Sequence, residues 1–117
     1  MKDRARGVLN GKIYIAQNAQ KVSSSQLNHN LLLSPGAEAD TKPELEIYAD
    51  DVKANHGASI GRLDEDKMFY LMSRGIRRDE AQRMLSMAFV EDVVMKIHSK
   101  ELRGFVEDRL GGLEIEA

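Results

Sequence analysis

The sequence lacks cysteine, long apolar runs and a large excess of one charge. Without cysteine the chain cannot form a disulfide, and it cannot supply a sulfur nucleophile or a thiolate ligand. Apolar runs such as residues 31–33 are far too short to cross a bilayer, and residues 1–7 contain no apolar signal core. These absences exclude a disulfide framework and a transmembrane segment of the usual length, and they predict a cytoplasmic protein.

Charge and motifs limit the possible functions further. The formal net charge of −2 gives no reason to expect nucleic acid or an anionic membrane as a partner. The sequence has no P-loop, no glycine fingerprint for a dinucleotide, no nucleophile elbow and no His-Glu-x-x-His motif. We therefore expect a protein that is not an enzyme on its own.

The composition changes sharply near residue 62. Residues before it form short β-like runs broken by small and polar residues, whereas the residues after Leu63 contain no proline and are periodic like helices. This change predicts a β part over residues 1–62 and a helical part over residues 63–117. Within the β part, Asn10-Gly11 is a strong turn signal, residues 34–43 have the composition of a loop, and residues 44–49 follow as a strand.

The β part also contains a weak repeat. Setting residues 13–22 over residues 45–54 pairs Ile15 with Ile47 and Lys21 with Lys53. An apolar strand, a polar turn and a second strand are typical of a β-solenoid, but an ordinary antiparallel sheet fits the same residues. A short solenoid would leave its ends exposed, so self-association through the β part is expected in that case.

Three helices are expected in the second part: residues 64–74, a long helix capped by Asp79 and reaching about His98, and a third helix capped by Ser99. The long helix is apolar over most of its circumference, since Met87, Val90 and Val94 lie away from its main apolar face. Packing between the other two helices explains this excess, and so does a second face that binds a partner.

His56 is the candidate functional residue of the β part. It lies in the segment "DDVKANHGAS" (residues 50–59), which is rich in Asp and Gly and predicts a turn that presents the imidazole outward to a metal or a partner. A lone histidine also fits a structural role. The nearby carboxylates Glu44, Glu46, Asp50 and Asp51 are typical of a solvated sheet edge.

Several segments in order resemble one known family. "RGVLNGKIYIAQNAQK", "QLNHNLLLS", "PELEIYADDVKANHGAS" and "DEDKMFYLMSRGI" are similar to the C-terminal part of the SufB/SufD family, from the Suf machine for iron–sulfur cluster assembly. The resemblance runs from Arg4 to about Leu110. It implies the end of a right-handed parallel β-helix over residues 1–62, followed by a small α-helical subdomain over residues 63–117.

Within this family the chain resembles the SufD type. Asn55 and Gly57 flank His56 where the SufB type has acidic residues, and the chain has no cysteine for sulfur transfer. The resemblance implies a non-catalytic subunit that pairs with a SufB-type scaffold through the β-helix and docks a SufC-type ATPase through the helices. No tightly bound cofactor is expected; His56 would face a transient iron–sulfur cluster or iron at the shared interface. The alternative is an adaptor that binds its partners and supplies no ligand.

The resemblance places the ATPase on the helical part, and the sequence nominates a surface there. The turn at residues 73–84 combines an apolar residue with arginines, which suits a protein interface. The second face of the long helix would extend this surface with adaptable side chains. The candidate partner-binding residues are Arg74, Ile76, Arg77, Arg78, Met84, Met87, Val90 and Val94.

Overall fold

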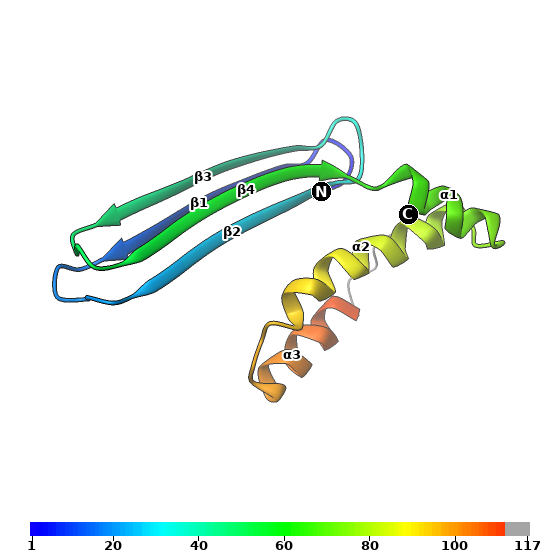
Figure 1. Cartoon of the computed structure of the whole chain (residues 1–117). Helices are drawn as coiled ribbons and strands as arrows, with labels where there is room; N and C mark the ends of the chain where they lie inside the picture. Colours follow the sequence, from blue (N-terminus) through cyan, green and yellow to red (C-terminus); the bar gives the residue numbers. More distant parts are fainter. Residues whose placement is uncertain (112–117) are drawn as a thin grey trace. The chain divides into compact units, whose positions relative to one another are not determined.

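Four strands and three helices make up the computed structural model, which describes residues 1–111 (Figure 1). The strands are β1 (Arg6–Ile15), β2 (Ser23–Leu32), β3 (Glu38–Ile47) and β4 (Lys53–Arg62). The helices are α1 (Glu65–Ser73), α2 (Arg78–Val94) and α3 (Lys100–Gly111). The chain divides between Arg62 and Leu63 into a strand unit and a helical unit.

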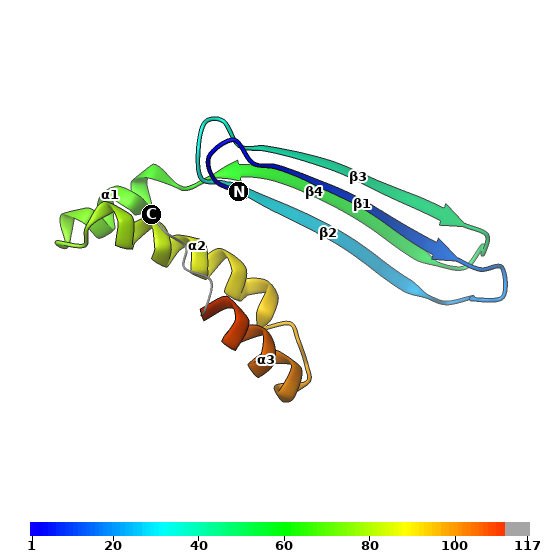
Figure 2. The same ribbon diagram turned by 180° about the vertical axis from the view of Figure 1, so that it is seen from behind.

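The strands form two separate two-stranded parallel sheets, β1 with β3 and β2 with β4. The chain alternates between the sheets, so the strands of one sheet run opposite to those of the other (Figures 1 and 2). The expectation of a right-handed parallel β-helix is therefore wrong. Each described strand has one hydrogen-bonded neighbour, whereas the stacked rungs of a solenoid would give its inner strands two. The parallel pairing also excludes the antiparallel sheet.

The repeat in the sequence corresponds to the register of one sheet. Ile13 pairs with Leu45 and Ile15 pairs with Ile47, as in the alignment of residues 13–22 with residues 45–54. The match does not continue into the second sheet, where Ser23 pairs with Lys53. Residues 16–22 join β1 to β2, and residues 48–52 join β3 to β4. The first connection is two residues longer, which shifts the register after the turn.

Asn10-Gly11 does not form a turn, because both residues lie inside β1. Gly11 instead leaves room for a side chain of the other sheet. The side-chain amide of Gln26, from β2, occupies the space that a Cβ at residue 11 would fill. The glycine therefore allows the two sheets to approach each other at this point.

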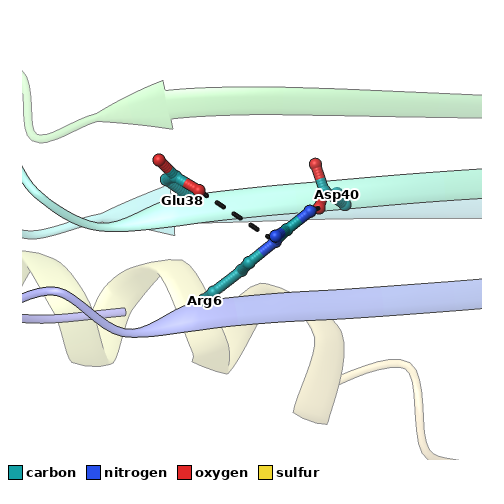
Figure 3. A network of polar contacts seen from close by, with 3 residues as sticks. All are labelled: Arg6, Glu38 and Asp40. Atoms are coloured by element: carbon teal, nitrogen blue, oxygen red, sulfur yellow. Dashed lines mark hydrogen bonds and ion pairs between the residues drawn. The ribbon is translucent and has the colours of Figure 1, made fainter.

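The loop expected over residues 34–43 is shorter than predicted, because β3 begins at Glu38. Arg6 of β1 explains part of this difference: its guanidinium donates hydrogen bonds to the Asp40 carboxylate and lies 4.0 Å from Glu38 (Figure 3). Pro43 does not interrupt the β1–β3 ladder. Glu38 and Tyr48 donate their backbone N–H to Ala5 and Ile15, so the even-numbered residues of β3 face β1 and the nitrogen of Pro43 faces away.

The strand unit has a small core. Ile15, Ala37 and Ala49 are its buried apolar residues. Alternation puts Gln26, Asn28 and other polar residues on the more buried face of β2, so this part of the interior is polar. Many large apolar side chains of the unit are exposed instead, namely Val8, Leu9, Tyr14, Val22, Leu27, Leu45, Ile47, Tyr48 and Ile60. A unit that leaves so much apolar surface in water is suited to contact with another protein.

Side-chain caps mark the starts of α1 and α3. The Asp64 carboxylate accepts hydrogen bonds from the N–H groups of Asp66 and Lys67, at 2.9 and 3.2 Å, and so caps α1. The Ser99 hydroxyl accepts from the N–H of Leu102 at the start of α3, which confirms the predicted cap. Gly75, with φ of 88°, follows α1 and reverses the chain.

The long helix differs from its predicted bounds at both ends. Its N-cap is Arg77, so Asp79 lies in the first turn and does not cap the helix. The Asp79 carboxylate accepts a hydrogen bond from the Arg77 guanidinium instead, at 2.8 Å. The helix ends at Val94 and does not reach His98. The Arg103 side chain donates to the carbonyl of Ile97 at 2.6 and 3.1 Å, so the chain after α2 is held by a side chain of α3.

Candidate functional site

His56 lies near the middle of β4, in a regular strand and not in the turn that its neighbours predict. It is exposed and pairs in register with Gln26 of β2. Its imidazole makes no hydrogen bond or ion pair with another residue of the described range 1–111. The ring is therefore available to a group outside this part of the chain.

The backbone N–H and C=O groups of His56 point away from β2. Lys53 donates its N–H to the carbonyl of Val22 at 2.9 Å. The N–H and C=O of one residue point to the same side of a strand, and this side alternates along the strand. Odd-numbered residues of β4 therefore bond to β2, and the backbone groups of His56 lie on the free edge. The site thus consists of an exposed imidazole on an unpaired strand edge.

The neighbours of His56 on the opposite face of β4 are held by cross-strand contacts. Asn55 accepts a hydrogen bond from the Ser25 hydroxyl at 2.6 Å, and Ser59 contacts the His29 ring at 2.7 Å. A methyl group of Leu27 lies beside the position that a Cβ at Gly57 would occupy. These contacts tie β4 to β2 and fix the position of the strand that carries His56.

Two of the four carboxylates near His56 in the sequence form ion pairs elsewhere. Glu44 lies 3.5 Å from Lys42, and Glu46 lies 3.0 Å from Lys12 on β1. The hydrogen bond from the Tyr48 hydroxyl, and then the contact with Lys12, hold the pKa of the Glu46 carboxyl below its ordinary value. Among residues 1–111 no three His, Asp or Glu side chains come together in a group that could hold a metal ion.

The predicted arginine surface is largely paired with acidic or aromatic side chains. Arg77 contacts Asp79 at 2.8 Å, and Arg78 lies 3.8 Å from Glu65 of α1. The Arg74 guanidinium lies 5.2 Å from the centre of the Tyr70 ring. All three arginines are exposed, and Ile76 is half-buried among them. The turn therefore presents charges that are already partly neutralised within the helical unit.

The second face of α2 lies against α3. Val94 is buried, and Met87 and Val90 are half-buried. A cleft of about 270 Å³ between the two helices is lined by Met87, Val90, Glu91, Val94, Glu107, Leu110 and Gly111. Met84, in contrast, is 42% exposed. Packing against α3 thus accounts for part of the apolar excess on the long helix, and the cleft leaves part of that face accessible.

Apolar side chains are also exposed on the other two helices, and two phenylalanine residues among them were not predicted as surface residues. Phe69 of α1 is 74% exposed, and Phe105 of α3 is 55% exposed beside Arg109. No signal in the sequence marks either residue as exposed. In addition, no helix among the described residues is long and apolar enough to span a membrane.

Comparisons with known proteins place the chain in one family. The family described as "SUF system FeS cluster assembly, SufBD core domain" matches residues 1–89. The chain is 46% identical to the iron–sulfur cluster assembly protein SufD of Escherichia coli (strain K12), over 95% of this chain and 26% of that protein. It is 42% identical to the iron–sulfur cluster assembly protein SufD of Bacillus subtilis (strain 168), over 83% of this chain and 22% of that protein.

A third relative is an iron–sulfur cluster assembly SufBD family protein of Synechocystis. It is 44% identical over 86% of this chain and 22% of its own length. The chain therefore spans about a quarter of the length of these relatives. The family match covers the strand unit and the first part of the helical unit, up to residue 89.

Proposed function

The chain belongs to the SufBD family, and on this premise we propose that it is part of a SufD-type, non-catalytic subunit for iron–sulfur cluster assembly. The observation that carries the proposal is the 46% identity to a SufD protein over 95% of the chain. In this proposal the strand unit pairs with a SufB-type scaffold, and the helical unit docks a SufC-type ATPase.

His56 is the residue that we propose for contact with the cluster or its iron during assembly. The exposed imidazole makes no bond to the described part of the chain, and its strand has a free edge. A neutral imidazole nitrogen is a good ligand for iron, but one nitrogen holds iron weakly. The other ligands would come from the SufB-type partner, since this chain has no cysteine.

A second candidate function is an adaptor that joins its partners and supplies no ligand. The exposed aromatic residues of the helical unit favour it, because Phe69 and Phe105 suit protein contact and have no ligand chemistry. The two candidates differ in one respect, which is whether the imidazole of His56 is needed for cluster formation.

The test is His56→Ala in the full protein, produced together with its SufB-type and SufC-type partners. His98→Ala is the control, because His98 is also an exposed histidine but lies between α2 and α3 in the helical unit. The ligand role predicts less cluster by visible absorption for His56→Ala, with unchanged copurification of the ATPase, and a normal yield for His98→Ala. Equal cluster yield in both variants would leave the adaptor as the function.

A further inference from the structure

Gln26 of β2 lies directly across from His56 of β4, on the same face of their sheet. The two residues are register partners, and the side chains of register partners point to the same side of a parallel sheet. Neighbouring strands lie about 4.8 Å apart, so a glutamine amide and an imidazole in this relation are within reach of each other. The Gln26 amide makes no hydrogen bond with another residue of the range 1–111, so its oxygen is free to accept one.

Gly11 of β1 gives the Gln26 amide a fixed seat. The Nε2 end of the amide lies where a Cβ at residue 11 would be, and Oε1 lies 3.1 Å from that position. The nitrogen end of the amide therefore sits against the backbone of β1, and the Gln26 side chain is half-buried. His56 is exposed, so its ring can turn toward the amide while the amide stays in place.

The other polar side chains on this face are less suited to bond to His56. A neutral imidazole that binds a metal ion through one nitrogen carries an N–H on the other, and this N–H needs an acceptor. Asn28 uses its Oδ1 to accept from the Asn30 amide at 2.9 Å, and its buried Nδ2, which has no partner in the described range, can only donate. Ser24 has a short side chain and lies two residues away from the register position of His56. Oε1 of Gln26 is therefore the acceptor that the register places beside the imidazole.

We propose that Gln26 is a positioning residue for His56: its Oε1 accepts the imidazole N–H and directs the second ring nitrogen outward. Histidines that bind metal ions commonly donate their other ring N–H to a fixed acceptor, which sets the tautomer and the orientation of the ring. The inference rests on the proposed function, because it adds the residue that presents His56 to the cluster or its iron. Gln26 acts through His56 and needs no contact with either.

The tautomer of His56 tests the inference without any cluster. In full protein that carries isotope-labelled histidine, at a pH well above the ordinary histidine pKa of about 6.5, the nitrogen shifts of the ring show which nitrogen holds the proton. The His56 signals are those that His56→Ala lacks. We expect one tautomer to dominate in the unmodified protein and a mixture in Gln26→Leu, which has no acceptor. Identical His56 shifts in the two proteins would overturn the inference.

Gln26→Glu is the conservative variant, because it keeps an oxygen acceptor at the end of a side chain of the same length. We expect it to retain a single dominant tautomer of His56. A mixture like that of Gln26→Leu would contradict a role for the amide oxygen.

Gly11→Ala tests the seat of the amide from the other sheet. The added Cβ would displace the Gln26 amide, so we expect the same mixture of His56 tautomers as in Gln26→Leu, although neither Gln26 nor His56 is replaced. Gly61→Ala is the matched control on β4, because nothing lies within 4 Å of its added Cβ. With both variants folded by circular dichroism, an unchanged tautomer in Gly11→Ala or an equal change in Gly61→Ala would refute the seat.

Cluster formation with the SufB-type and SufC-type partners separates this inference from the proposed function. Loss of a residue that orients a metal-binding histidine commonly lowers metal affinity or activity by about 10- to 100-fold, so we expect at least a tenfold slower formation of cluster with Gln26→Leu and an unchanged rate with Gly61→Ala. If His56→Ala has no effect, the proposed ligand role fails, and the tautomer measurement still decides whether Gln26 orients the ring. If His56→Ala slows cluster formation and Gln26→Leu does not, this inference alone is overturned.

Discussion

The Tyr48 hydroxyl and the Lys12 ammonium group both contact the carboxylate of Glu46, at 2.7 and 3.0 Å. These residues join β1 to the end of β3 on the exposed face of the sheet, where Tyr14 also packs against Tyr48 with ring centres 5.6 Å apart. Both contacts favour the charged carboxylate, and they lower the pKa of Glu46 below its ordinary value of 4.5. The interaction therefore depends on pH.

The sign of this dependence follows from the direction of the pKa shift. A carboxyl whose pKa is lower in the folded protein stabilises it fully above its ordinary pKa, and this contribution is lost as the pH falls through the lowered pKa. We expect Tyr48→Phe and Lys12→Met each to raise the pKa of Glu46, because each variant removes a contact that favours the charged carboxylate. Titration of the Glu46 carboxyl by NMR measures both variants. An unchanged pKa in either variant would contradict the role of the residue that was replaced.

At the scale of the element, the caps of the helices were predictable from sequence where a single local contact decides them. The acidic start of α1 and Ser99 before α3 belong to this class. The start of α2 was not predictable in this way. Asp79 satisfies the usual pattern for an N-cap, but its carboxylate pairs with Arg77 and the helix begins before it. Where a residue can either cap a helix or form an ion pair, the sequence alone does not show which contact it makes.

We expect Asp64→Ala to lower the free energy of unfolding of the helical unit by about 1 kcal/mol, the typical cost of losing an N-cap. Its carboxylate bonds to two N–H groups of the first turn, which would lose this partner. Asp66→Ala is the control, because Asp66 lies in the same turn but caps nothing. Urea denaturation followed at 222 nm measures both variants, and an equal loss in the two would argue against the cap.

The strands show a different limit. Alternation within residues 13–15 and 45–47 indicated strands, and the repeat even matched the register of β1 with β3. The sequence could not show how many strands each sheet has, because that number depends on contacts between distant residues. His56 was expected to be exposed in a turn; it is exposed in a strand. The glycine and aspartate residues that suggested the turn reflect close packing near Leu27 and the connection before β4.

At the scale of the whole molecule, apolar side chains reach the surface of both units, including Tyr14 and Ile60 on strands and Phe69 and Leu102 on helices. A protein with a small core and this much exposed apolar surface gains stability from its partners. This property agrees with the proposed place of the chain in a larger assembly.

The candidate partner-binding residues of the helical unit lead to a prediction about the ATPase. Truncating Ile76 or Met87 to Ala should weaken binding of the SufC-type ATPase by about 1–3 kcal/mol if either side chain is a central contact. Met95→Ala is a suitable control, because Met95 is 56% exposed at the end of α2, away from the turn at residues 73–84. Titration calorimetry with folded variants measures the effect, and unchanged affinity for Ile76→Ala and Met87→Ala would remove this surface from the proposal.

The alternation of the chain between two sheets has a consequence for how the protein folds. Each strand pairs with a strand two places away along the chain, β1 with β3 and β2 with β4. Ile13 must therefore reach Leu45 to form one sheet, and Ser23 must reach Lys53 to form the other. The strand unit thus contains no hairpin pair that could form first by local contacts. Closing such long loops costs entropy before any ladder bond is gained, and non-local pairing slows folding. In pulsed hydrogen exchange, the amides of α1 and α2 should therefore become protected before those of β1–β4.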